Sequence, residues 1–366
     1  MSPADRGVLL VVEQLRRRVP GGIGTYATGL ARGLAGLPGG SRPPVRLLAS
    51  RVRGADPLTS LGLPLDTIAV GSRALVKAWD LGALRVGRTS AVVHSVSIVS
   101  PPSTAPLVVT VHDLAPVRLP EAFPSRGRRW HAAALARATR RASFVVVPCE
   151  AVADDVRAHA PGLAADRVVV IEEGSDHLPP ADHVAADVLL GRLGIVGGVL
   201  LAVGTLEPRK NLDRLLDAYS RARRRLDEPW PLLVVGPAGW GSRARSLPDG
   251  VVLAGRVPDS VLRALYERCR CLAYVPLLEG FGLPVVEAMR AGAPVVASPV
   301  PSAGGAALEV DPLDVESIAN GLVAASSDEV VRRELVAAGH TRVSGLTWGA
   351  TARAHVELWL RAAEER

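Results

Sequence analysis

The chain has 366 residues, of which 48% are hydrophobic and 22% are charged, so it can bury a sizeable core and is not intrinsically disordered. The length corresponds to about two domains, and no apolar run approaches the ~18 residues that span a bilayer. Three cysteines are too few for a disulfide framework, and the first apolar stretch is too short for a signal peptide. These features predict a cytoplasmic protein.

The net charge of +7 lies in the first half of the chain. Residues 1–186 contain 22 lysines and arginines against 15 acidic residues, a difference of +7, whereas residues 187–366 contain 21 of each. Lys77 and Lys210 are the only lysines, and all other basic side chains apart from histidine are arginine. A lysine inside a motif is therefore a stronger sign of function here than in an ordinary chain.

Short apolar runs alternate with longer helical patterns along the whole chain. The runs typical of buried strands lie at 8–12, 45–49, 91–94, 107–111, 143–147, 168–171, 200–203, 232–235, 251–253, 272–275 and 294–297. Helical patterns lie at 25–34, 128–142, 212–225 and 260–268. Strands without alternation, separated by helices, indicate parallel sheets covered on both faces. The sequence thus predicts an α/β protein with two doubly wound, Rossmann-like domains.

The break between these domains is predicted around residues 173–187, where periodicity is lost and Gly174, Pro179 and Pro180 occur. We expect an N-terminal domain at 1–176, a linker at 177–187 and a C-terminal domain at 188–347. The segment at 348–366 is helical and has no following strand, and its return to the first domain stays open. Ligands of doubly wound sheets bind outside the carboxyl ends of the strands, so two such domains facing each other would hold the active site in the cleft between them.

A glycine-rich segment, PGGIGTY, lies at residues 20–26. Gly22, Gly24 and Ala27 fit the spacing of the dinucleotide fingerprint, but ten residues separate them from the preceding strand, and the acidic residue expected about 20 positions later is missing. A nicotinamide-dependent oxidoreductase is therefore disfavoured. The segment is expected to be a flexible loop before a helix, where N–H groups hold a phosphate, or a plain tight turn.

His112 and Asp113 follow the predicted strand at 107–111, at the end where ligands bind. A histidine there could hydrogen-bond a ligand hydroxyl, and the alternative is an ordinary polar strand end. The sequence contains no Asp-x-Asp motif and no histidine cluster with metal-ligand spacing. We therefore expect no metal, with positively charged side chains in its place.

The segment LLAVGTLEPRKNL at 200–212 combines a buried strand, a polar loop and a helix that begins at Asn211. Asn211 is a residue type that caps helices. Arg209 and Lys210 would then lie just before a helix N-terminus, where two cations and the helix dipole favour a phosphate or diphosphate. The alternative is a solvated basic turn.

The segment YVPLLEGFGLPVVEAMRAG at 274–292 carries two glutamates eight residues apart. Glu279 precedes Gly280-Phe281-Gly282, and Pro284 suits the first turn of a helix that carries Glu287 near its start. Glycines let a backbone approach a ligand closely, and both carboxylates can line one pocket and accept hydrogen bonds from sugar hydroxyls. The alternative is a loop acid and a first-turn acid that complements the helix dipole.

Five segments in this order resemble the retaining glycosyltransferases of family GT4, which have the two-domain GT-B fold. They are GGIGTY, VVTVHDLAPVRLP, GTLEPRKNL, GRVPDSVLRALY and EGFGLPVVEAMRAGAPVVAS. The resemblance implies a metal-independent hexosyltransferase that uses a nucleotide diphosphate sugar, with GDP-mannose favoured, and a glycan or lipid-linked acceptor bound by the first domain. No nucleic-acid partner is implied. The alternatives are a nucleotide-sugar-binding subunit without transfer activity and a transferase acting on a secondary metabolite.

The resemblance also implies roles for individual residues. Arg209 and Lys210 would neutralise the donor diphosphate, Glu279 and His112 would contact the donor sugar, and Glu287 would hold the ribose. The remaining donor-binding residues would contribute through their backbone: Gly22 near the diphosphate, Phe281, Gly282 and Leu283 near sugar and phosphate, and Val257 near the base. Two departures from the family pattern are a short loop after Ser298 and the pair Glu172-Glu173 where relatives have a Pro-Asn turn.

The segment SRGRRWHAAALARATRR at 125–141 concentrates positive charge on one predicted helix. Its arginines fall broadly toward one side, with Trp130 at the edge, and a helix of this kind can lie on an anionic membrane surface. Peripheral contact with the inner face of the membrane would suit a lipid-linked acceptor. The alternative is a solvated helix with Trp130 packed inward.

Overall fold

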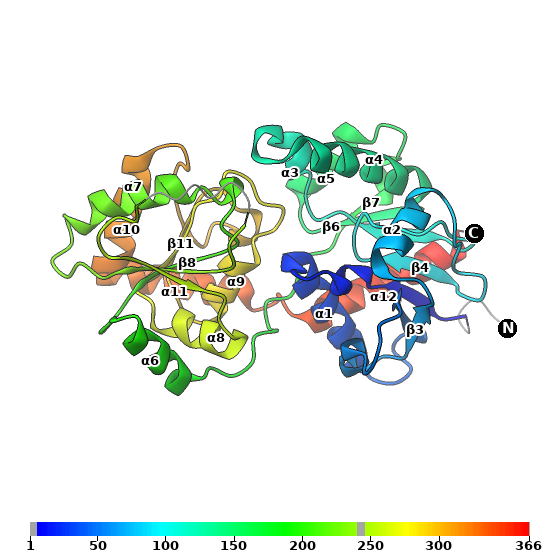
Figure 1. Ribbon diagram of the computed structural model, residues 1–366, viewed down its shortest axis with the longest axis horizontal. Coiled ribbons are helices and arrows are strands. Elements are labelled where there is room, and N and C mark those ends of the chain that lie inside the picture. Colours follow the sequence, from blue (N-terminus) through cyan, green and yellow to red (C-terminus); the bar gives the residue numbers. More distant parts are fainter. Residues whose placement is uncertain (1–5, 240–245, 366) are drawn as a thin grey trace. The chain divides into compact units, whose positions relative to one another are not determined.

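The computed structural model describes residues 6–239 and 246–365, and the chain divides into two compact units (Figure 1). The first unit comprises Met1–Gly174 together with Leu346–Arg366, and the second comprises Ser175–Gly345. Each unit contains one sheet whose paired strands run parallel. The predicted fold class, two doubly wound α/β sheets of Rossmann type, is confirmed.

The sheet of the first unit has the strand order β3-β2-β1-β4-β5-β6-β7. Its strands are β1 (Val8–Val11), β2 (Val45–Ser50), β3 (Leu65–Ile68), β4 (Val92–Ser95), β5 (Leu107–Thr110), β6 (Phe144–Val147) and β7 (Val168–Val170). Most of these strands are short and rich in valine and leucine, and they are buried on both faces, as parallel strands covered by helices should be. Strand β3 was not predicted, because its sequence Leu-Asp-Thr-Ile is half-buried at the edge of the sheet.

The described residues of the first unit form six α-helices. They are α1 (Gly21–Ala35), α2 (Ser72–Asp80), α3 (Ala115–Arg118), α4 (Ser125–Arg141), α5 (Glu150–His159) and α12 (Trp348–Glu364). Helix α12 packs against α1 (Figure 1). The two approach closely because α1 has glycine at the crossing: a Cβ atom on Gly29 would lie 2.2 Å from the indole of Trp348.

Helix α12 is also tied to the first sheet by a line of buried hydrogen bonds. The line joins six groups from α12, β4, β5 and α1: Trp359, His94, Thr110, Tyr26, His355 and the carbonyl of Thr351. The indole N–H of Trp359 donates to His94 Nδ1 at 3.2 Å, and His355 Nδ1 donates to the carbonyl at 2.7 Å. These two ends fix the direction of every bond between them: His94 Nε2–H donates to the threonine hydroxyl, that hydroxyl donates to the tyrosine, and the tyrosine donates to His355 Nε2. Both histidines must be neutral for the line to be complete.

The sheet of the second unit has the order β10-β9-β8-β11-β12-β13. Its strands are β8 (Leu200–Val203), β9 (Leu232–Val235), β10 (Val251–Gly255), β11 (Cys271–Tyr274), β12 (Val295–Ala297) and β13 (Leu308–Glu309). Its helices are α6 (His183–Arg192), α7 (Leu212–Arg223), α8 (Asp259–Arg268), α9 (Leu283–Arg290), α10 (Val315–Ser327) and α11 (Glu329–Val343).

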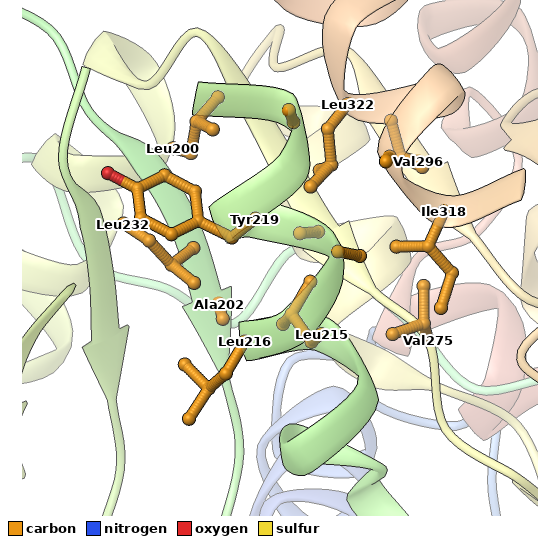
Figure 2. Close-up of a cluster of buried hydrophobic side chains, with 14 of the residues drawn as sticks. Leu200, Ala202, Leu215, Leu216, Tyr219, Leu232, Val275, Val296, Ile318 and Leu322 are labelled. Carbon is orange, nitrogen blue, oxygen red and sulfur yellow. The ribbon is translucent and has the colours of Figure 1, made fainter. Parts of the chain in front are cut away.

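Helix α7 lies at the centre of a buried cluster in this unit (Figure 2). Leu215 and Tyr219 of α7 belong to this cluster together with Leu200 of β8 and with Ile318 and Leu322 of α10. Burying each such side chain stabilises the fold by about 1.5–3 kcal/mol. The cluster therefore fixes α7, and with it the loop that leads from β8 into the helix.

The compact units differ from the predicted domains in the linker and at both ends of the second domain. The predicted linker at 177–187 is partly helical, since α6 begins at His183, where the side chain of Asp182 accepts a hydrogen bond from the Ala185 N–H. The compact units instead meet in the chain at Gly174 and Ser175 and again at Gly345 and Leu346.

Candidate active site

The second unit has a topological switch point between β8 and β11, which are neighbours in the sheet but not in the sequence. Ligands of open α/β sheets bind at such a point, outside the carboxyl ends of the strands. The segment after β8 carries Arg209 and Lys210 on a short 3-10 turn, Pro208–Lys210, and the segment after β11 carries Glu279. The fold thus brings the two predicted cations and the first predicted glutamate to one edge of the sheet.

These three side chains form a compact ionic cluster. Arg209 Nη1 lies 2.9 Å from Glu279 Oε1, and Lys210 Nζ pairs with the same carboxylate oxygen. Lys210 also donates to the hydroxyl of Tyr274 at 2.8 Å, and Arg209 Nη2 lies 2.9 Å from Glu207 Oε1. The charged side chains are between 6% and 18% exposed. Two cations and two carboxylates in nearly buried positions therefore cancel in net charge.

The charge state of the cluster follows from its contacts. Burial alone would raise the pKa of the Glu279 carboxyl, but Lys210 and Arg209 lower it by more, so the net pKa lies below the ordinary value. Burial and the negative charge of Glu279 raise the pKa of Tyr274 well above its ordinary value. At neutral pH the cluster therefore contains an ionised carboxylate and a protonated tyrosine, and Tyr274 is a site residue that sequence reasoning missed.

Asn211 follows the cluster but does not cap α7 as predicted. The residue has a positive φ of 59° and makes no side-chain capping hydrogen bond. Its amide instead donates to the carbonyl oxygens of Val275 at 3.0 Å and Pro312 at 2.7 Å. These long-range bonds outweigh the local capping preference, and they hold the turn with the two cations against the end of β11.

The glycine-rich turn leads directly into α9. Gly282 has a φ of 100°, a conformation that favours glycine, and a Cβ atom there would lie 2.3 Å from the side chain of Val300. The neighbouring Phe281 and Leu283 are buried. Ser302 closes the turn from the short segment after β12: its hydroxyl donates to the carbonyl of Gly282 at 2.9 Å.

Glu287 is the fifth residue of α9 and is buried, so it is not the first-turn acid of the alternative interpretation. Its Oε1 lies 3.0 Å from His177 Nε2, and its Oε2 accepts a hydrogen bond of 3.0 Å from the hydroxyl of Tyr266. Burial, and then Glu287 itself, raise the pKa of Tyr266 well above its ordinary value. The second glutamate is thus held by a tyrosine and a histidine rather than by the cations. No sequence signal pointed to His177, which comes from the segment before α6.

In the first unit, Gly22 lies in the opening turn of α1 and not in a loop. The helix begins at Gly21, whose φ is +64°, so the predicted flexible loop is wrong. A Cβ atom on Gly22 would meet no atom within 4 Å, which leaves its backbone approachable. An approachable N–H in a first helical turn remains compatible with anion binding.

His112 follows β5, as predicted, but both of its ring nitrogens have partners within the protein. Nδ1 lies 3.2 Å from the buried Glu173 carboxylate and Nε2 lies 2.9 Å from the carbonyl oxygen of Val96. Burial lowers the pKa of His112, but Glu173 and the carbonyl raise it by more, so the net pKa lies above the ordinary value. This contact explains the unusual acid at position 173. A sugar hydroxyl would have to share one of these N–H groups.

Two other predictions concern residues outside these clusters. Val257 lies on the loop after β10 and is half-buried. Trp130 does not lie at an exposed helix edge: its indole donates to Asp80 at 3.0 Å and its ring packs against the core of the first unit. Arg137 pairs with the same aspartate. The interfacial role of Trp130 is therefore wrong, and the exposed arginines of α4 are Arg126, Arg129 and Arg140.

The structure also bears on the cysteines, on metal sites and on membrane-spanning helices. Cys269 and Cys271 are free, buried thiols, and burial raises the pKa of Cys271 to about 12. Within residues 6–239 and 246–365, no group of three or more His, Cys, Asp or Glu side chains has the arrangement of a metal site. Across the same ranges, no helix has the length and apolar character needed to cross a bilayer.

Comparison with known proteins identifies the family. Residues 20–177 match the family model described as Glycosyltransferase Family 4, and residues 197–328 match the model described as Glycosyl transferases group 1. The O-antigen chain mannosyltransferase B of Escherichia coli is 32% identical over 257 residues, which are 66% of this chain and 66% of that protein. The serotype-specific mannosyltransferase WbdA of Escherichia coli is 27% identical over 272 residues, 69% of this chain and 33% of that protein. The chain thus spans about two thirds of one relative and a third of the other.

Solved structures agree on the fold. The crystal structure of Anabaena Alr3699/HepE in complex with UDP and glucose superposes with a TM-score of 0.70 at 18% sequence identity, covering 97% of this chain and all of that one. The matched family segments contain strands β2 to β7 of the first sheet and all strands of the second, and they include the turns with Arg209-Lys210 and Glu279. The chain therefore belongs to glycosyltransferase family 4, with the two Rossmann-type sheets of the GT-B fold.

Proposed function

We propose that the chain is a retaining hexosyltransferase that moves a mannosyl group from GDP-mannose to a glycan or lipid-linked acceptor in the cytoplasm. The observation that carries the proposal is the cluster of Arg209, Lys210 and Glu279 at the switch point of the second sheet. The choice of mannose is supported by the relatives, two of which are named mannosyltransferases. The glycan acceptor is supported by the name of the first, an O-antigen chain mannosyltransferase.

The two cations provide the electrostatic part of the mechanism. When the bond between the sugar and the nucleotide diphosphate breaks, negative charge builds up on the leaving phosphate. Arg209 and Lys210 stabilise this charge where it develops, in a nearly buried site in which fixed charges act strongly. Positive side chains can thus take the place of a divalent metal ion, and we propose a metal-independent reaction.

The remaining donor contacts surround this cluster. Glu279 accepts hydrogen bonds from the sugar hydroxyls, and the backbone N–H groups of Phe281, Gly282 and Leu283 approach the sugar and phosphate. Glu287 holds the ribose hydroxyls, for which Tyr266 and His177 orient its two oxygens. In the same proposal, the backbone near Val257 receives the base.

The chemical step needs no protein nucleophile. The bond from the anomeric carbon to the phosphate oxygen breaks, and the acceptor oxygen forms its new bond on the same face of the sugar. The acceptor proton passes to the phosphate oxygen that leaves, so atoms and charge balance and the anomeric configuration is retained. Gly22 and His112, in the first unit, are proposed to contact the diphosphate and the donor sugar, respectively.

A donor screen followed by a transfer assay tests the proposal. GDP-, UDP- and dTDP-sugars are compared by thermal shift, because a ligand at 100 times its dissociation constant stabilises the folded protein by ~2.7 kcal/mol. We expect GDP-mannose to stabilise the protein most and the product linkage to keep the donor configuration. Donor binding with neither hydrolysis nor transfer would identify a nucleotide-sugar-binding subunit instead. Transfer only to a small aglycone would identify an enzyme of secondary metabolism.

A further inference from the structure

We propose that Glu279 is an exchangeable counter-ion that lets the active site distinguish the intact donor from the nucleoside diphosphate product. In this proposal Arg209 and Lys210 leave Glu279 and pair with the diphosphate only when sugar hydroxyls donate hydrogen bonds to the Glu279 carboxylate in their place. The inference rests on the proposed function, because it assumes that the two cations bind the donor diphosphate.

The geometry places one carboxylate oxygen on both cations. Glu279 Oε1 lies 2.9 Å from Arg209 Nη1 and also pairs with Lys210 Nζ. A phosphate oxygen that approaches either cation therefore competes with this carboxylate. Glu207, the other acid of the cluster, contacts the arginine through the opposite nitrogen, Nη2, and need not move.

The burial of the cluster makes this competition strong. The side chain of Glu279 is only 9% exposed, and a buried ionised carboxylate that loses its partners is strongly destabilised. The hydroxyl of Tyr274 also lies beside Glu279, but it is neutral and cannot replace two cations. Glu279 therefore needs new hydrogen-bond donors whenever the cations turn to a phosphate.

An intact nucleotide sugar supplies both an anion for the two cations and hydrogen-bond donors for the carboxylate. Its diphosphate pairs with Arg209 and Lys210, and its sugar hydroxyls donate to Glu279. A nucleoside diphosphate supplies the phosphates alone and leaves the carboxylate without a cation or a sugar hydroxyl to pair with. After transfer the sugar has left with the acceptor, so Glu279 returns to the cations and promotes product release.

Glu287 offers a matched control eight residues away. It is also a buried glutamate, but it contacts His177 and Tyr266 rather than Arg209 or Lys210. Replacing it by glutamine removes the same charge by the same isosteric change without releasing Arg209 or Lys210. The two Glu→Gln variants should therefore change the affinity for the product in opposite directions.

The test is calorimetric titration of wild type, Glu279→Gln and Glu287→Gln with GDP, GDP-mannose and inorganic pyrophosphate. Another nucleotide is used if the donor screen selects it. Glu279→Gln should bind GDP and pyrophosphate at least about tenfold more tightly than wild type, and should lose most of the preference for GDP-mannose over GDP. Glu287→Gln should bind GDP more weakly and pyrophosphate unchanged.

A second measurement needs no variant and covers the case in which Glu279→Gln fails to fold. Free mannose at high concentration should tighten the binding of GDP to the wild-type protein, because its hydroxyls can take over the carboxylate. Unchanged or weaker GDP binding by folded Glu279→Gln, or no coupling between mannose and GDP in wild type, would overturn the inference while leaving the transferase proposal intact. If no nucleotide or nucleotide sugar binds to any form of the protein, the proposed function fails and the inference fails with it.

Discussion

Acidification should loosen α12 from the rest of the first unit, because the line of hydrogen bonds between this helix and β4, β5 and α1 requires two neutral histidines. Burial lowers the pKa of His355 from the ordinary 6.5 to about 4, and burial lowers that of His94 well below its ordinary value. The folded-state pKa lies below the unfolded one in both cases. As pH falls below 6.5 the unfolded state therefore binds more protons, and stability is lost until the folded pKa is reached.

The magnitude follows from the pKa shift of His355 alone. Each pH unit in the window between the two pKa values costs about 1.4 kcal/mol, so lowering the pH from about 6.5 to about 5 costs about 2 kcal/mol. His94 acts in the same direction. His112 has a raised pKa, so its contribution is already complete below pH 6.5 and changes little in this window.

The assay is hydrogen exchange of the amides in α12, converted to a free energy of opening after correction for the intrinsic exchange rate at each pH. It is preferred to a global melt because two units need not unfold together. His355→Gln removes one titrating group and should flatten the pH dependence between 6.5 and 5. His159→Gln changes an exposed histidine of the same unit and should leave the wild-type slope. Equal slopes in wild type and His355→Gln would refute the reasoning.

Four further predictions concern the reaction and its setting. Lys210→Ala should lower kcat by at least about 100-fold at saturating donor. Lys77→Ala, the same change at the other lysine, should leave kcat unaltered. Near-normal turnover of Lys210→Ala would contradict the proposed role of Lys210. Tyr266→Phe should raise the donor KM with little change in kcat, because Tyr266 orients Glu287 and contacts to the ribose are alike in ground and transition states. An unchanged donor KM would contradict the assignment of Glu287 to the ribose. Transfer activity should survive EDTA, and a full loss restored by magnesium would show that a metal takes part. Binding to anionic liposomes through α4 should be purely electrostatic, so it should occur at low salt and be lost at high salt. The double change Arg126→Glu with Arg129→Glu should weaken it. Binding that persists at high salt would instead reveal an apolar contact.

The sequence predicts the strands of both sheets well where they are continuous apolar runs. The segments at 200–203 and 232–235 are matched residue for residue by β8 and β9. The edge strands β3 and β13 were missed, because β3 contains Asp66 and Thr67 and β13 has only two residues. A strand paired on one side only is half-buried and loses the unbroken hydrophobic pattern.

The contacts that define the candidate site were less accessible to sequence reasoning. Glu173 is 61 residues from His112, and His177 is 110 residues from Glu287, so no local pattern links either pair. Asn211 shows the opposite problem: a strong local preference for capping is overridden by two carbonyl groups from distant segments. Side-chain partners of this kind depend on tertiary packing, which periodicity does not encode.

The return of α12 to the first unit has a consequence for the order of folding during synthesis. The ribosome makes all of Ser175–Gly345 before it makes α12, so the second unit has its complete sequence before the first does. Until α12 arrives, the buried hydroxyl of Tyr26 and the ring of His94 lack partners that only this helix supplies. The nascent first unit should therefore stay incompletely packed while the second folds. In this incompletely packed state it would be accessible to chaperones and proteases.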